Sequence, residues 1–125
     1  MGKRIMIVDD ESDVCFTLRK VLGENGYVVD SYEDPFLALS KFKADLYDLV
    51  ILDIKMPELN GFALYRELKR LDTKVKVCFL TAGELYYDVY SDIFSSLPAN
   101  RFIRKPIDNE RLLNRIEDII TDDTM

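Results

Sequence analysis

Five short apolar runs alternate with segments of helical period along this chain, and this alternation restricts the fold more than any other feature. Strands are expected over residues 3–8, 27–32, 47–52, 75–80 and 101–104. Between and after them, apolar residues recur three or four positions apart, which is typical of helices. These helices are expected over residues 12–23, 35–45, 62–71, 85–96 and 108–120.

Strands that alternate with helices predict a parallel sheet covered by helices on both faces. The crossovers between parallel strands are expected to be right-handed. At 125 residues the chain has the length of one domain. We therefore expect an α/β fold with a doubly wound, five-stranded parallel sheet in one domain over residues 1–125.

Local signals mark several helix ends. Asp34 stands before Pro35, a combination typical of a helix start, and Ser12 and Asp108 are expected to cap the first and last helices. Asn25 or Gly26 is expected to take a positive φ after the first helix. These signals place the expected helices to within a few residues.

Composition excludes several classes of function. The net charge of −6 opposes a nucleic-acid or anionic membrane surface, although a small basic patch around Arg101, Arg104 and Lys105 is possible. The chain has no histidine, so any metal is expected to be a hard ion bound by oxygen. Cys15 and Cys78 are expected to be buried, reduced thiols. No apolar stretch is long enough to span a bilayer or to act as a secretion signal, so a cytoplasmic protein is expected.

Polar residues close four of the expected strands. In parallel sheets, ligands bind outside the carboxyl ends of the strands, where the strand order reverses. Two or three carboxylates in one crevice repel each other and need a cation nearby. The fold should therefore gather these residues into one pocket: Asp9, Asp10, Asp53, Thr81 and Lys105.

This residue set suits Mg²⁺ and a phosphoryl group. Asp10 and Asp53, with a backbone carbonyl from the loop after Asp53, could bind the ion. Asp53 could act as a nucleophile and form an acyl phosphate. Thr81 could donate a hydrogen bond to a phosphoryl oxygen, and Lys105 could neutralise another.

The motifs around these residues resemble the receiver domain of two-component response regulators. The resemblance covers essentially the whole chain, in the right order. The most specific part of the resemblance is the loop from Asp53 through Met56-Pro57 to Gly61. The resemblance also includes Asp9-Asp10, Thr81-Ala82 and Lys105-Pro106.

The resemblance implies a flavodoxin-like (βα)5 fold with strand order 2-1-3-4-5. It implies that Asp53 accepts a phosphoryl group from a sensor histidine kinase or phosphotransfer protein, beside an acidic pocket of Asp9 and Asp10. Further implications are a Mg²⁺ site of Asp10, Asp53 and the Lys55 backbone carbonyl, switch residues at Thr81 and Phe102, and a cis Lys105–Pro106 peptide.

The chain departs from the common family pattern at several positions. Residue 102 is phenylalanine where tyrosine is frequent, and residues 97–100 replace the usual Gly-Ala before the last strand. Lys55 and Gly83 occupy positions that influence phosphate lifetime in the family. We expect these differences to affect the fourth helix, the switch and the rate of dephosphorylation.

The residues leave other functions open. One is an interaction module of the same fold that is never phosphorylated; the others are an aspartyl-phosphate hydrolase of the haloacid dehalogenase kind and a flavodoxin. Lys55 stands where the hydrolase needs a second aspartate, and the acidic loop after the first strand does not suit a flavin phosphate. We therefore expect a phosphoacceptor that modifies itself and is not a turnover enzyme.

Partners are expected on a defined surface. The chain as given contains no output domain, so it is expected either to act through a separate partner or to be a fragment of a longer protein. An effector or a second copy would bind through the fourth helix, fifth strand and fifth helix. Tyr86 and Tyr90 share one face of the expected fourth helix and are candidate contacts. Direct binding to nucleic acid or to membranes is not expected.

Overall fold

Five parallel strands form a single sheet in the order β2-β1-β3-β4-β5. The structure, a computed structural model, describes residues 2–81, 91–105 and 108–122. The strands are β1 (Arg4–Val8), β2 (Val28–Tyr32), β3 (Leu49–Asp53), β4 (Lys76–Thr81) and β5 (Phe102–Arg104). The helices are α1 (Ser12–Glu24), α2 (Pro35–Lys41), α3 (Gly61–Leu71), α4 (Ser91–Ser96) and α5 (Asn109–Thr121), with a 3-10 turn η1 (Ala99–Arg101). The expected α/β fold and strand order are confirmed.

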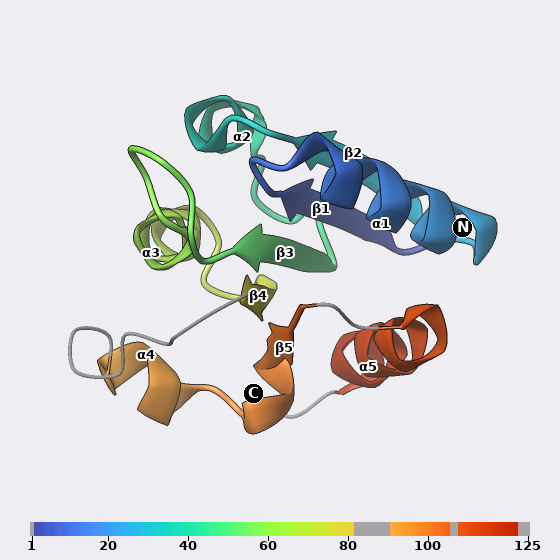
Figure 1. Cartoon of the computed structure of the whole chain (residues 1–125). Helices are drawn as coiled ribbons and strands as arrows, with labels where there is room; N and C mark the ends of the chain where they lie inside the picture. Colours follow the sequence, from blue (N-terminus) through green and yellow to red (C-terminus); the bar gives the residue numbers. More distant parts are fainter. Residues whose placement is uncertain (1, 82–90, 106–107, 123–125) are drawn as a thin grey trace.

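The strand order reverses at β1, and this reversal determines where the expected ligand pocket lies. β1 pairs with β2 on one side and with β3 on the other, both in parallel. The chain therefore leaves β1 toward one edge of the sheet and returns to build the other edge from β3 onward (Figure 1). The carboxyl ends of β1 and β3 lie at this reversal, where doubly wound sheets bind ligands.

Helices cover both faces of the sheet, α1 and α5 on one face and α2, α3 and α4 on the other (Figure 1). Successive strand residues point to opposite faces, so Val50 and Leu52 of β3 join one core while Leu49 and Ile51 join the other. All of β3 is buried. The central strand is thus held from both sides, and its last residue, Asp53, is placed by two packed cores.

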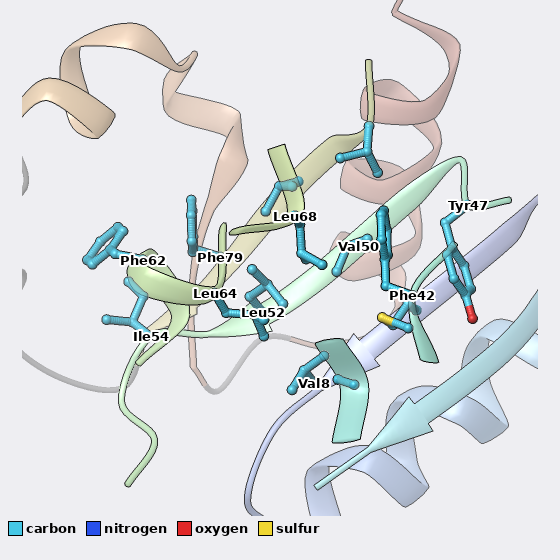
Figure 2. Packing of buried hydrophobic residues seen from close by; sticks show 14 of the residues in the cluster. Val8, Phe42, Tyr47, Val50, Leu52, Ile54, Phe62, Leu64, Leu68 and Phe79 are labelled. Atoms are coloured by element: carbon cyan, nitrogen blue, oxygen red, sulfur yellow. The ribbon is translucent and has the colours of Figure 1, made fainter. Parts of the chain in front are cut away.

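The core beneath α2 and α3 is rich in aromatic side chains (Figure 2). Phe62 of α3 lies 4.9 Å from Phe79 of β4 between ring centroids, and Phe42 stacks on Tyr47 at 5.9 Å. Aromatic pairs at such distances contribute beyond their buried area, by about 0.5–1.5 kcal/mol each. This packing fixes the position of α3 relative to β3 and β4.

Three of the expected signals at helix ends are confirmed, and the expected cap of α1 is not. The Asp34 side chain accepts from the backbone N–H groups of Phe36 and Leu37, and Asp108 accepts from Arg111. Gly26 has a φ of 92°. The expected Ser12 cap is wrong: the N-cap of α1 is Glu11, without a side-chain cap hydrogen bond.

Arg101 corrects a second expectation. It ends η1 instead of opening β5, and its side chain is buried. A surface patch that combines it with Arg104 and Lys105 is therefore wrong. Similarly, α2 ends at Lys41, earlier than expected, because Phe42 turns to extended backbone with φ −65° and ψ 137°.

Several expectations lie outside the described residues: Tyr86 and Tyr90, Gly83, and the Lys105–Pro106 peptide. Of the expected fourth helix, the structure describes α4. Both cysteines are buried and free, as expected. Within the described ranges, every helix is too short or too polar to cross a bilayer.

Candidate functional site

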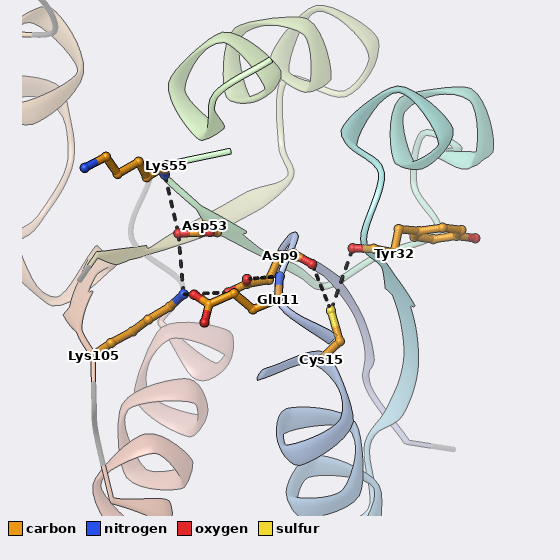
Figure 3. A network of polar contacts seen from close by, with 7 residues as sticks. All are labelled: Asp9, Glu11, Cys15, Tyr32, Asp53, Lys55 and Lys105. Carbon is orange, nitrogen blue, oxygen red and sulfur yellow. Dashed lines mark hydrogen bonds and ion pairs between the residues drawn. The ribbon is translucent and has the colours of Figure 1, made fainter. Parts of the chain in front are cut away.

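Three strand ends bring Asp9, Asp53 and Lys105 together (Figure 3). Asp9 follows β1, Asp53 is the last residue of β3, and Lys105 follows β5. The Lys105 Nζ lies 2.8 Å from Asp9 Oδ2, 3.6 Å from Asp53 Oδ1 and 3.2 Å from Glu11 Oε1. Residues far apart in the chain thus form one charged cluster at the carboxyl edge of the sheet.

Backbone pairing places Lys105 and Thr81 at this edge. Thr81 is the register partner of Arg104, and the Lys105 N–H donates to the Thr81 carbonyl at 2.7 Å. Thr81 is buried as the last residue of β4. It therefore lies beside the backbone of Lys105, whose side chain reaches the carboxylates.

The turn after β1 holds Asp9 rigidly. Its N–H donates to the Tyr32 carbonyl at 3.1 Å, and its Oδ1 accepts from the Glu11 N–H at 2.9 Å. The buried Cys15 thiol donates to the Asp9 carbonyl at 3.2 Å (Figure 3). Asp9 is fully buried, whereas Asp10 and Glu11 are exposed. One carboxylate of the turn is thus fixed and two remain open to solvent.

The charges around Asp53 make its ionisation costly. Burial and the neighbouring Asp9 raise the pKa of Asp53 to about 7, and a hydrogen bond with Asp10 acts in the same direction. Lys105 and the Lys55 N–H oppose this rise. For Lys105, burial lowers the pKa, but its interactions with Asp9, Asp53 and Glu11 outweigh burial and raise it. One lysine therefore does not fully compensate the carboxylates.

The acidic cluster has the donor set of a hard divalent cation. Oxygen atoms of Asp9, Asp10, Glu11 and Asp53 all lie within 4.8 Å of one another. Mg²⁺ prefers oxygen ligands and takes one or two protein carboxylates. The uncompensated negative charge and these oxygens fit such an ion. The proposed role of the Lys55 carbonyl stays a prediction.

The loop after β3 requires a glycine at position 61. A Cβ there would lie 2.3 Å from the Asp53 carbonyl oxygen, and the Gly61 N–H donates to the Ile54 carbonyl at 2.9 Å. Asn60 caps α3 by accepting from the Ala63 N–H at 2.9 Å. Glu58 has a positive φ of 70°. The loop is therefore folded tightly against the backbone of Asp53.

The structure brings most of the predicted site residues together, and the side chains of Phe102 and Lys55 are the exceptions. Asp9, Asp10, Asp53 and Lys105 form the cluster, with Thr81 beside it. Phe102 is half-buried and stacks on Phe79 at 5.4 Å between centroids, so its ring belongs to the edge of the core. Lys55 is exposed, and its side chain extends away from the cluster (Figure 3).

Glu11 was not predicted as a site residue. Its carboxylate reaches Lys105 across 94 positions of sequence. The Asp9-Asp10-Glu11 run indicated negative charge at this turn, but it gave no sign that the third side chain folds back over the pocket. The pairing depends on where β5 ends relative to β1, which is a tertiary feature.

Comparisons with known proteins agree with this geometry. The profile of the response regulator receiver domain matches residues 5–117. The regulatory protein VanRB of Enterococcus faecalis is 35% identical over 96% of this chain and 53% of its own length. The transcriptional regulatory protein RprY of Bacteroides fragilis is 32% identical over 94% of this chain and 49% of its own. The chain spans about half the length of these curated relatives.

Solved structures show the same fold. The non-phosphorylated HemR receiver domain from Leptospira biflexa superposes with a TM-score of 0.86 at 26% identity, covering 99% of this chain and 98% of that one. The response regulator TrrA from Thermotoga maritima, solved in complex with Mg²⁺-BeF, gives a TM-score of 0.74 at 32% identity. That match covers 94% of this chain and 98% of that one.

Proposed function

The chain belongs to the response regulator receiver domain family, and we propose that Asp53 is the residue on which it accepts a phosphoryl group. The observation that carries this proposal is the position of Asp53. It ends the central strand, it is buried, and its Oδ1 lies 3.6 Å from the only ammonium group that enters the acidic cluster among the described residues. A nucleophile for phosphoryl transfer needs this combination of fixed position and nearby positive charge.

In the proposed reaction a carboxylate oxygen of Asp53 attacks the phosphorus of a phosphohistidine. An O–P bond forms while the N–P bond to the imidazole breaks, and the imidazole nitrogen takes up a proton. Lys105, now held by Asp9, would neutralise a phosphoryl oxygen, and the Thr81 hydroxyl would donate to another. Asp10 and Asp53 would hold Mg²⁺, with the Lys55 carbonyl, and the bound ion would neutralise phosphoryl oxygens.

The proposed partners follow from the family. A sensor histidine kinase or phosphotransfer protein would supply the phosphoryl group. The surface of α4, β5 and α5 would carry the signal to an effector or a second copy, and Thr81 and Phe102 would act as the switch. Because the curated relatives are about twice as long, we propose only the receiver activity for residues 1–125.

The family matched is a signalling domain, and we propose that the chain modifies itself without turning over an external substrate. The alternative is a receiver-like interaction module that is never phosphorylated. The close approach of Lys105 to Asp9 and Asp53 favours the phosphoacceptor, because two buried carboxylates beside one ammonium group are costly and bring no benefit to a module that is never phosphorylated.

The test is incubation with acetyl phosphate and Mg²⁺, followed by intact-mass measurement. We expect one added phosphoryl group in the wild type and in Asp118→Asn, a matched change at an exposed aspartate of α5. Asp53→Asn should gain none. An equal mass gain in Asp53→Asn would assign the acceptor elsewhere, and no gain in the wild type would favour the interaction module.

A further inference from the structure

A second pocket lies at the opposite end of β4 from the acidic cluster. It has a volume of about 560 Å³ and is bordered by α3, the turn before β4, the end of α4 and η1. Thr73 to Lys76 form its wall at the start of β4, whereas Thr81 ends that strand beside the cluster. The two pockets are therefore separated by the length of the strand.

This pocket is basic in an acidic chain. Among the described residues that line it, four are basic and none is acidic: Lys69, Lys74, Lys76 and Arg101. The chain as a whole carries a net charge of −6. Basic groups are therefore concentrated here against the overall charge of the chain, and the local field favours an anion.

Arg101 is the unusual member of this set. Its side chain is only 7% exposed, its Nη1 donates to the Val77 carbonyl at 3.4 Å, and its Nε has no hydrogen-bond partner. Within the described ranges, no carboxylate lies at ion-pair distance from it. A buried guanidinium with an unmet donor and no carboxylate beside it is costly, and such a group marks a place where an anion would be stabilised.

The other basic side chains have roles that Arg101 lacks. The Lys76 Nζ donates to the carbonyls of Ile119 and Ile120 at the end of α5. The Lys69 Nζ donates to the carbonyls of Thr73 and Val75 at 3.1 and 2.7 Å. Both therefore have acceptors, and Lys74 is exposed to solvent, so the buried unmet donor in the pocket is the Arg101 Nε.

Lys69 adds positive charge beside this donor. Burial and the nearby Arg101 lower the pKa of Lys69, against an opposing effect of Asp72. The carboxylate of Asp72 already accepts from the N–H groups of Asp45 and Lys74. The two cations therefore repel each other, and an anion bound in the pocket that they both line would reduce that repulsion.

We infer that this pocket binds a small oxyanion of the phosphate or carboxylate class, with Arg101 as its anchor. The planar guanidinium presents donors that match two oxygens of such an anion, and Lys69 contributes long-range attraction. The site needs no residue of the acidic cluster. It is therefore independent of the phosphoacceptor proposal.

The test is an NMR titration of the full chain with inorganic phosphate, and separately with acetate, at constant ionic strength and without Mg²⁺. We expect a saturable shift of the Arg101 Nε–Hε signal and of the backbone amides of Ser95, Ser96 and Leu97. The wild-type side-chain signal provides this readout without any substitution. The two anions distinguish a phosphate site from a general carboxylate site.

Variants then locate the site. Arg101→Gln should weaken anion binding by roughly tenfold or more, and Arg101→Lys should weaken it less because the charge remains. Arg70→Gln, a matched change at an exposed arginine of α3, should bind as the wild type does. Non-saturable shifts for both anions in the wild type, or equal affinity in Arg101→Gln, would overturn the inference.

Discussion

Replacing Asp53 by asparagine is expected to stabilise the protein when Mg²⁺ is absent. Asp53 is 3% exposed, and burial with Asp9 raises its pKa from 3.8 to about 7. This rise corresponds to about 4 kcal/mol of folding free energy lost when Asp53 is fully ionised. The raised pKa already includes the attraction of Lys105 at 3.6 Å, so asparagine removes the whole of this cost. Its buried amide loses hydrogen bonding that the carboxylate makes, which costs about 1–3 kcal/mol, so we expect a net gain of about 2 kcal/mol.

The raised pKa of Asp53 also determines how the stability of the protein changes with pH. Between pH 3.8 and about pH 7, the folded state binds more protons at Asp53 than the unfolded state does. The free energy of unfolding therefore falls as the pH rises through this range and levels off above it. In Asp53→Asn this contribution is absent, so the two proteins should differ little at low pH and most above neutrality.

The assay is urea unfolding of both proteins across this pH range with a chelator, repeated with Mg²⁺. Binding of the ion to the folded state should raise the stability of the wild type more than that of Asp53→Asn. Asp118→Asn controls for the loss of one negative charge. A variant less stable than the wild type above neutral pH, or parallel pH profiles for the two proteins, would refute the reasoning about the buried carboxylates.

Three further predictions concern residues around the cluster. Gly61→Ala should destabilise the protein by about 1–3 kcal/mol and slow phosphorylation, because the added Cβ would collide with the Asp53 carbonyl. Urea unfolding measures the first effect and the acetyl phosphate assay the second. Wild-type values in both would show that the collision does not occur. Lys55→Ala should change the decay rate of the phosphorylated protein, followed by intact mass; an identical rate would remove Lys55 from the mechanism. Cys15 and Cys78 should react with a thiol reagent only after unfolding, because burial raises their pKa to about 11 and about 12; fast labelling of the native protein would contradict this.

Much of the site could be predicted from the sequence because strand ends are easy to recognise. The apolar run before Asp53 identifies a buried strand, and its polar end must lie at the carboxyl edge of a parallel sheet. The same reasoning placed Asp9 and Lys105 at that edge without any knowledge of side-chain packing. Parallel strands run in one direction, so their carboxyl ends lie at the same edge of the sheet regardless of how the cores pack.

The remaining features depend on distances that no local pattern contains. Glu11 reaches Lys105 only because the turn after β1 faces the end of β5. Arg101 was expected at the start of a strand and on the surface, yet it ends η1 and is buried above β4. Ser12 had the residue type of a cap, but the turn held by Asp9 placed Glu11 at the cap position.

The sequence by itself therefore determined the order of strands and helices along the chain, the edge of the sheet that carries the chemistry, and most of the residues that gather there. Tertiary structure decided which of these side chains touch, how strongly burial perturbs Asp53, and where an unpaired arginine lies. The physical reason is that periodicity and capping are properties of neighbouring residues. Burial and ion pairing instead depend on segments that meet only after the sheet has formed.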